Sequence, residues 1–290
     1  MRMKISVATA WLLLAVAATC RADIDQLQQS FAHPPDDARI MVRWWWFGPA
    51  VTKPELEREM KLMKEGGIGG FEVQPTYPLA LDDEKPGLRN LAFLSPEFLD
   101  CLSFTAQKAK ELGLRFDLTL GSGWPYGGPM IPITEAAAKL RIESMRFTAG
   151  ARTVNLPRIG DGERLIAAFI DGRQLLAQAQ GNAMPLPAEV KAPGEAMFFI
   201  ASRTRQTVKR PAFGAEGYVL DHYDPAAVDN FIKNVADVEL KAVAANPPHA
   251  AFCDSLEVYG NDWTGDLLSE FQKRRGYDLL PHLPALLGNL

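Results

Sequence analysis

Carboxylates, tryptophans and other hydrogen-bonding side chains end four short apolar runs of this sequence. The candidate sugar-binding residues among them are Arg43, Trp45, Glu72, Gln74, Asp117, Trp124, Asp254 and Tyr259. Sugar rings present apolar C–H faces and many hydroxyl groups, so stacking aromatic rings beside such hydrogen-bonding groups suit a carbohydrate. We therefore expect these residues to form a carbohydrate site.

Glu257 is the strongest catalytic candidate. Glycosidic cleavage needs a protonated carboxyl group for the leaving oxygen and a second carboxylate as base or nucleophile. Glu257 lies between Leu256 and Val258 and beside Tyr259, and a half-apolar setting would raise its pKa. The sequence shows no convincing second catalytic carboxylate.

A structural role is the alternative for these acids, because strand-end carboxylates also cap helices and form salt bridges. Asp117 alternates with apolar neighbours, so it could instead pair with Arg43 inside a barrel. Asp254 and Glu257 are three residues apart, which places them on opposite faces of a strand unless the strand ends between them. A metal shared by that pair is therefore not predicted, and the metal ligands stay unknown.

Other chemistries have weak support. The segment 121–123 lacks the longer glycine pattern of a nucleotide site, and Ser122 is not in a nucleophile elbow. The histidines show no metal-ligand spacing, and we expect them to be capping or surface residues; they are His33, His222, His249 and His282. The composition is 47% apolar and 23% charged with a formal net charge of −4. Because the basic residues are scattered, no nucleic-acid partner is predicted.

The candidate residues lie in an alternation of strands and helices. We expect strands at 40–47, 68–73, 114–120 and 249–258, and helices that begin near Thr52, Ser95, Asp224 and Thr264. Short connections between them predict right-handed βαβ units and a parallel sheet. The fold class is then α/β, with the first four strand–helix units of a (β/α)₈ barrel, whose ligands lie at the carboxyl ends of the strands.

The alternation breaks between residues 130 and 217. There we expect a short helix at 135–139 and then antiparallel strands, which form a β-rich insertion, with a disordered linker at 176–194 as the alternative. The predicted organisation is a signal peptide at 1–22, a first barrel segment at 23–129, the insertion at 130–217 and a second barrel segment at 218–290. The chain ends before a barrel could close.

The N-terminus has the pattern of a secretory signal peptide, because Arg2 and Lys4 precede an uncharged apolar run at 5–18. Cleavage after Ala22 would export the protein to the periplasm or the medium, without a transmembrane anchor. A lipid on Cys20 is the alternative. We expect Cys101 and Cys253 to be small buried hydrophobic residues, with a disulfide between them as the alternative.

Five segments resemble the bacterial α-L-rhamnosidases of glycoside hydrolase family 106. They are RWWWFG at 43–48, GGIGGFEVQP at 66–75, DLTLGSGWP at 117–125, GYVLDHY at 217–223 and DSLEVYG at 254–260. The resemblance implies a (β/α)₈ barrel with β-rich insertions and inverting hydrolysis of terminal α-L-rhamnose from polysaccharides or glycosides. It also implies a calcium ion at the sugar and the general acid at Glu257, with the base further along the barrel.

Two further hypotheses use the same residues. The chain could be a non-catalytic carbohydrate-binding protein that uses the tryptophans without a working acid and base. It could also be an inactive fragment, since family members are longer and half a barrel exposes open sheet edges. A second chain that completes the barrel would be its partner, alongside a rhamnose-containing glycan as substrate.

Overall fold

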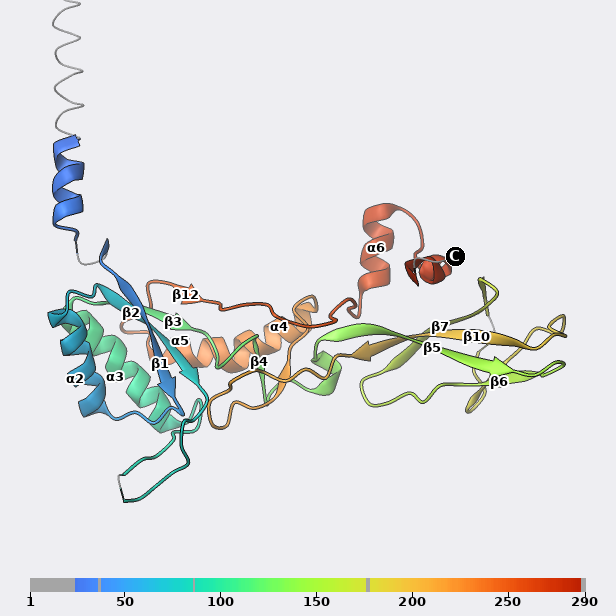
Figure 1. Cartoon of the computed structure of the whole chain (residues 1–290), viewed down its shortest axis with the longest axis horizontal. Helices are drawn as coiled ribbons and strands as arrows, with labels where there is room; N and C mark the ends of the chain where they lie inside the picture. The colour runs from blue at the N-terminus through green and yellow to red at the C-terminus, as the bar shows by residue number, and fades with distance from the viewer. Residues whose placement is uncertain (1–23, 36–37, 86, 176–177, 288–290) are drawn as a thin grey trace, which may run out of the picture.

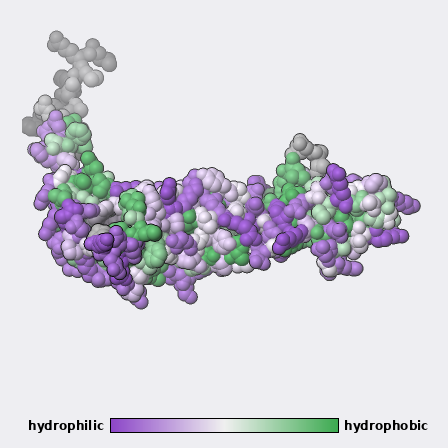
Figure 2. All heavy atoms as spheres, turned by 60° about the horizontal axis from the view of Figure 1, so that its bottom comes forward, coloured by the Kyte–Doolittle hydropathy of each residue, from purple (hydrophilic) through white to green (hydrophobic). Residues whose placement is uncertain are grey.

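The computed structural model describes residues 24–35, 38–85, 87–175 and 178–287 (Figure 1). The predicted signal peptide, with Cys20, lies outside the described residues. A parallel sheet with its helices occupies one end of the elongated molecule, and an antiparallel sheet occupies the other. On the face seen in Figure 2, hydrophilic residues cover most of the surface and hydrophobic residues form small separate patches. Among the described helices, none is long and apolar enough to cross a membrane.

Four parallel strands form the sheet that the sequence predicts. Their order is β1 (Met41–Phe47), β2 (Gly70–Thr76), β3 (Arg115–Thr119) and β12 (Ala251–Phe252). The connections contain α2 (Lys53–Glu65), α3 (Pro96–Leu112), and the run of α4 (Pro225–Phe231), the π-helix η3 (Ile232–Ala236) and α5 (Asp237–Ala242). The described residues form no closed barrel.

The fourth strand is much shorter than the predicted 249–258. Phe252 pairs with Thr119, the last residue of β3. Beyond that point the chain has no neighbouring strand to pair with, so it leaves the sheet. Cys253 follows directly and is exposed, which contradicts the prediction that it is buried, whereas Cys101 is buried as expected. Both cysteines are free, so the alternative of a disulfide is wrong.

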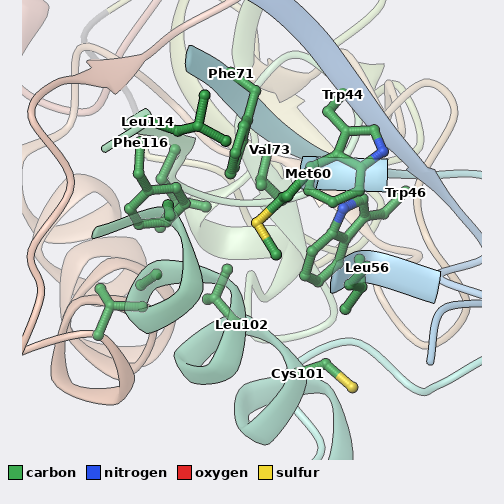
Figure 3. Packing of buried hydrophobic residues seen from close by; sticks show 14 of the residues in the cluster. Trp44, Trp46, Leu56, Met60, Phe71, Val73, Cys101, Leu102, Leu114 and Phe116 are labelled. Atoms are coloured by element: carbon green, nitrogen blue, oxygen red, sulfur yellow. The ribbon is translucent and has the colours of Figure 1, made fainter. Parts of the chain in front are cut away.

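One face of the parallel sheet packs on the helices (Figure 3). Strand residues alternate between faces, and this alternation separates the three consecutive tryptophans. Trp44 and Trp46 are buried in the helix-facing core with Phe71, Leu56 and Met60. Trp45 projects to the opposite face, as the alternation predicts.

The helix boundaries follow the local signals in the sequence, with one exception. Ser95 accepts a hydrogen bond from the backbone N–H of Phe98, and Gly113 ends α3 in the left-handed conformation. Thr52 precedes α2 in extended conformation, but its side chain makes no cap hydrogen bond. Thr52 and Glu55 have the spacing of a capping box, but Glu55 instead accepts a 2.6 Å hydrogen bond from Arg58.

The segment between β3 and α4 contains an antiparallel sheet. Its strand order is β5 (Ala138–Phe147), β10 (Gly194–Arg203), β7 (Arg164–Ile170) and β8 (Arg173–Gln174). Two strand pairs accompany it, β6 (Thr153–Asn155) with β9 (Ala183–Pro185), and β4 (Gly127–Gly128) with β11 (Tyr218–Val219). β9 lies within the stretch for which a disordered linker was the alternative.

The helix expected at 135–139 is not present. A 3₁₀ helix, η2 (Ile133–Glu135), ends there and β5 begins at Ala138. The backbone N–H of Ala137 donates to the carbonyl of Val219, a residue far away in the sequence. This long-range pairing draws the segment into extended conformation despite its alanines.

The last elements pack on the antiparallel sheet. They are α6 (Leu267–Arg275) and the 3₁₀ helix η4 (Leu280–Leu287). Leu279 and Leu283 share a buried cluster with Phe169 and Phe199 of that sheet, and Leu267, Leu268 and Phe271 lie against it. The helix expected to cover the parallel sheet after its fourth strand therefore covers a different surface.

Candidate active site

The second face of the parallel sheet is polar. Because side chains alternate, Glu72, Gln74 and Thr119 project away from the apolar core and are buried there. In the register of the sheet, Arg43 of β1 pairs with Glu72 of β2, and Glu72 pairs with Asp117 of β3. Candidate residues from three separate segments thus form one row across the sheet.

Arg43 is the centre of an ion-pair cluster. Its Nε lies 3.0 Å from Glu72 Oε2 and its Nη1 lies 2.8 Å from Asp254 Oδ1. The Thr119 hydroxyl donates to Glu72 Oε1, and the guanidinium lies over the ring of Phe252, 4.3 Å from its centroid. The cluster joins β1, β2, β3 and the segment after β12, so it fixes the carboxyl edge of the sheet.

Trp45 and Trp124 lie beside this cluster, with ring centroids 6.1 Å apart. Trp124 belongs to the loop 121–126, which buried hydrogen bonds hold in place. Gln74 Nε2 donates to the carbonyl of Gly123 at 3.3 Å, and the Ser122 hydroxyl donates to the carbonyl of Pro75 at 3.1 Å. One aromatic ring from β1 and one from the loop 121–126 are therefore held together at the same edge.

Glu257 lies in a polar setting rather than the half-apolar one expected. Its Oε2 is 2.9 Å from Lys209 Nζ, and it accepts a hydrogen bond from the Tyr259 hydroxyl. These hydrogen bonds, first from Tyr259 and then from Lys209, lower the pKa of Glu257. Leu256 is 62% exposed, so it does not shield the carboxylate. The expected rise in pKa is therefore wrong for the free protein.

A neighbouring loop holds the Glu257 segment in place. Gln206 Nε2 donates to the carbonyl of Glu257 at 2.8 Å, and its Oε1 accepts from the N–H of Tyr259 at 2.9 Å. The backbones of Lys209 and Trp124 exchange two hydrogen bonds. Glu257 is thus connected through Lys209 to the loop that carries Trp124.

Asp117 stands apart from the cluster despite its place in the row. Arg115 donates to both of its carboxylate oxygens, at 3.1 and 2.9 Å, and the N–H of Ala250 donates to Oδ1. The alternative in which Asp117 pairs with Arg43 is therefore wrong, because Glu72 and Asp254 occupy the Arg43 guanidinium. His249 also faces Asp117, at 3.8 Å.

Several residues of the site carried no signal in the sequence. Lys209 and Gln206 come from the loop after the antiparallel sheet, and their position beside Glu257 depends on long-range folding. Thr119 had a readable signal, since it alternates with Asp117 along β3 and so lies on the same face. β12 ends at Phe252, before both Asp254 and Glu257, so strand alternation does not decide where these two point.

Calcium at the sugar is an expectation that rests on the family resemblance. Calcium takes six to eight oxygen ligands, and no group of three or more His, Cys, Asp and Glu residues gathers in the described part of the chain. Glu72 and Asp254 both face the cationic Arg43 guanidinium. Both carboxylates therefore share one cation, and calcium stays a prediction.

Comparison with known protein families finds a match that covers most of the chain. The family model described as alpha-L-rhamnosidase, glycoside hydrolase family 106, matches residues 32–161 and 200–290. The chain belongs to this family. The residues between the two matched stretches, 162–199, contain β7, β8, β9 and the start of β10.

One protein of similar sequence and one of similar structure can be compared with this family member. A putative beta-glucuronidase from Formosa agariphila is 24% identical over 321 residues, which cover 92% of this chain and 27% of that protein. The structure of a rhamnosidase from Novosphingobium sp. PP1Y matches with a TM-score of 0.62 and 16% identity, over 90% of this chain and 42% of the other. The glycoside hydrolase chain thus spans between about a quarter and two fifths of the relatives it matches, and it shares the fold of the rhamnosidase.

Proposed function

We propose that this chain carries part of the active site of an exported α-L-rhamnosidase, which hydrolyses terminal α-L-rhamnose from polysaccharides or glycosides. The observation that carries the proposal is the Trp45–Trp124 pair, which connects two groups of carboxylates. Trp45 is two residues from Arg43 of the Glu72–Arg43–Asp254 cluster, and Trp124 exchanges backbone hydrogen bonds with Lys209, the partner of Glu257. A sugar ring stacked on the tryptophans would have hydrogen-bonding partners on both sides.

Glu257 is the proposed general acid. An acid must hold a proton at the working pH, whereas Lys209 and Tyr259 favour the carboxylate in the free protein. A sugar seated against Trp124 would withdraw Glu257 from water, and desolvation raises the pKa of a carboxyl group. In an inverting enzyme the base lies about 6.5–9.5 Å from the acid, with a water molecule between them. We place that base outside the residues of this site.

A neutral sugar fits the site better than a uronic acid. Recognition of a uronate carboxylate calls for a cation with free donors. Arg43 already pairs with two carboxylates and Lys209 with Glu257. The charge pattern therefore favours a deoxy sugar such as rhamnose over glucuronic acid, although one relative is named a putative beta-glucuronidase.

The parallel sheet supports a barrel as the wider architecture. Its strand order matches the sequence order, and helices connect successive strands. Such units close into a (β/α)₈ barrel when eight are present, so we propose that these four units belong to such a barrel. The signal-peptide pattern supports export of the protein.

Chromogenic substrates test the function. A version of the chain extended through the remaining strands of the proposed barrel is incubated with an aryl α-L-rhamnoside and, separately, with an aryl β-D-glucuronide, and the wild type is compared with Glu257→Gln. We expect turnover of the rhamnoside alone and at least a 100-fold loss in the variant, since a general acid contributes about 10²–10⁴-fold. Glu270→Gln, on α6, is the matched control because Glu270 is also ion-paired at the surface.

Three results would contradict the proposal. Full activity of Glu257→Gln would remove Glu257 from the mechanism, and turnover of the glucuronide alone would reassign the substrate. Rhamnose binding in a calorimeter without any turnover would favour the carbohydrate-binding alternative. The anomeric form of the released sugar, followed by NMR, tests inversion.

A further inference from the structure

A glutamate interrupts the apolar stripe of the helix between β3 and β12. Ala227, Phe231, Val235, Glu239 and Val243 follow one another at intervals of four residues, and all five are buried. In a regular α-helix each such step drifts by about 40° around the axis. The wider turns of the π-helix η3 reduce that drift, so Glu239 keeps the inward direction of the stripe.

The Glu239 side chain is fully enclosed. The residue is 0% exposed, and neither carboxylate oxygen has a hydrogen-bond partner among the described residues. Burial raises the pKa of Glu239 well above its ordinary value, and the nearby backbone N–H of Gly121, whose geometry falls short of a full hydrogen bond, offsets this only in part. Burying a carboxylate without a partner costs much free energy of folding, whereas burying the neutral acid costs much less.

Glu239 faces the loop that carries Trp124. Gly121 begins this loop with φ at +130°, and a Cβ on Gly121 would lie 3.1 Å from the ring of Phe231. At the end of the loop, the Tyr126 ring packs on Phe231 with centroids 5.0 Å apart. The loop is thus seated on the helix segment that presents Glu239.

Three other titratable groups, Tyr126, Cys253 and Glu72, lie near Glu239 on the loop and the sheet. The Tyr126 hydroxyl donates to the carbonyl of Phe252 at 3.1 Å. Burial first, then Cys253, Glu239 and Glu72, raise the pKa of Tyr126. These neighbours stay neutral or are anionic, so none supplies a positive charge to Glu239. Of the described groups near Glu239, only the Gly121 amide would stabilise its ionised form.

We propose that Glu239, as a neutral carboxylic acid, is a positioning residue that seats the loop 121–126 and thereby sets the place of Trp124. Ionisation of Glu239 at high pH would draw water toward the carboxylate and loosen the loop from the helix. The consequence for sugar binding rests on the proposed function. The consequence for the loop itself does not.

Hydrogen exchange of the 121–126 peptide and thermal unfolding test the loop directly. The full chain is compared with Glu239→Gln, which keeps the shape without ionising, and with Glu239→Ala, which leaves a cavity. Asp237→Asn is the control because Asp237 is exposed on the same helix. Exchange of the wild-type peptide should rise relative to Glu239→Gln as pH increases from the ordinary range of a glutamate to the folded-state pKa, by up to about tenfold for each pH unit, and then level off.

The sign of the stability change is fixed by the raised pKa. The wild type loses stability as pH rises above the ordinary range of a glutamate, until the folded-state pKa is reached. Glu239→Gln lacks this loss, so its Tm should match the wild type near pH 4 and exceed it by several degrees at pH 8. Glu239→Ala should show faster loop exchange at every pH.

The outcomes separate the two proposals. Identical pH profiles of exchange and Tm in wild type and Glu239→Gln would overturn the role of Glu239, as would equal losses in the Gln and Ala variants. Calorimetry with L-rhamnose adds the functional readout, with a wild-type affinity that falls at high pH and a flat profile in Glu239→Gln. If the loop responds as expected but no rhamnose binds, the proposed function fails while the positioning role of Glu239 stands.

Discussion

Replacing Arg43 with methionine removes the guanidinium that pairs with two carboxylates at the edge of the parallel sheet. The Glu72 side chain is 8% exposed, so it would keep a charge with only the Thr119 hydroxyl as its partner. Removing one partner of a buried ion pair costs about 3–5 kcal/mol. The Arg43 and Asp254 side chains are 34% and 27% exposed, so water replaces part of the loss. We expect a cost of about 2 kcal/mol.

Urea denaturation of the chain measures this cost, and a double-mutant cycle isolates the ion pair. In Arg43→Met with Glu72→Gln the unpaired charge is absent, so the double variant should be more stable than the sum of the single losses predicts, by about 1 kcal/mol. Arg58→Met is the matched control, since both side chains of the 2.6 Å Arg58–Glu55 pair are more than half exposed. It should change stability by at most about 0.5 kcal/mol.

Additive losses in the cycle would refute this reasoning, because they would show that Arg43 and Glu72 do not stabilise each other. An Arg43→Met variant as stable as the wild type would refute it more directly. Either result would mean that water reaches Glu72 at the sheet edge.

Three further predictions concern other parts of the molecule. Trp124→Ala should weaken rhamnose binding about fivefold by calorimetry, as expected from about 1 kcal/mol for one aromatic contact, and unchanged affinity would exclude Trp124 from the site. Hydrogen bonds from Ser202, the Gly160 amide and Arg141 outweigh burial and lower the pKa of Glu163 from 4.5 to about 2. Stability should therefore fall as pH drops from about 4.5 to about 2, and this limb should vanish in acid titrations of Glu163→Gln. Gly123→Ala would place a Cβ 2.2 Å from the Lys209 carbonyl oxygen, whereas a Cβ at Gly150 meets nothing within 4 Å at a similar positive φ. Only Gly123→Ala should lower the free energy of unfolding by more than the roughly 1 kcal/mol of left-handed strain. Equal effects of the two substitutions would contradict the close approach.

Local signals in the sequence were sufficient for much of the fold. Alternating side chains placed Trp44 and Trp46 in the core and Trp45 on the opposite face. Ser95 and Gly113 marked the ends of α3 because capping is a local interaction. The strand at 249–258 was overestimated because strand length depends on a neighbouring strand, and β3 offers no partner beyond Thr119.

The sequence predicted which residues form the candidate site better than it predicted how those residues are paired. Glu72, Arg43 and Asp254 do meet, as strand-end positions suggested. The partner of Asp117 was misassigned because Arg115, two residues away on the same strand, reaches it directly. The environment of Glu257 was misjudged because Lys209 arrives from a loop about fifty residues earlier, and contacts of that range leave no local trace in the sequence.

The sequence by itself determined the βαβ alternation, the apolar and polar faces of the sheet, and the family to which the chain belongs. These depend on periodicity and on motifs, which are properties of neighbouring residues. Only the tertiary structure decided how the side chains are paired and charged. Glu257 and Glu239 show the physical reason, since both are glutamates beside apolar residues in the sequence. A lysine and a tyrosine keep the first anionic, and an enclosed interface favours the neutral form of the second.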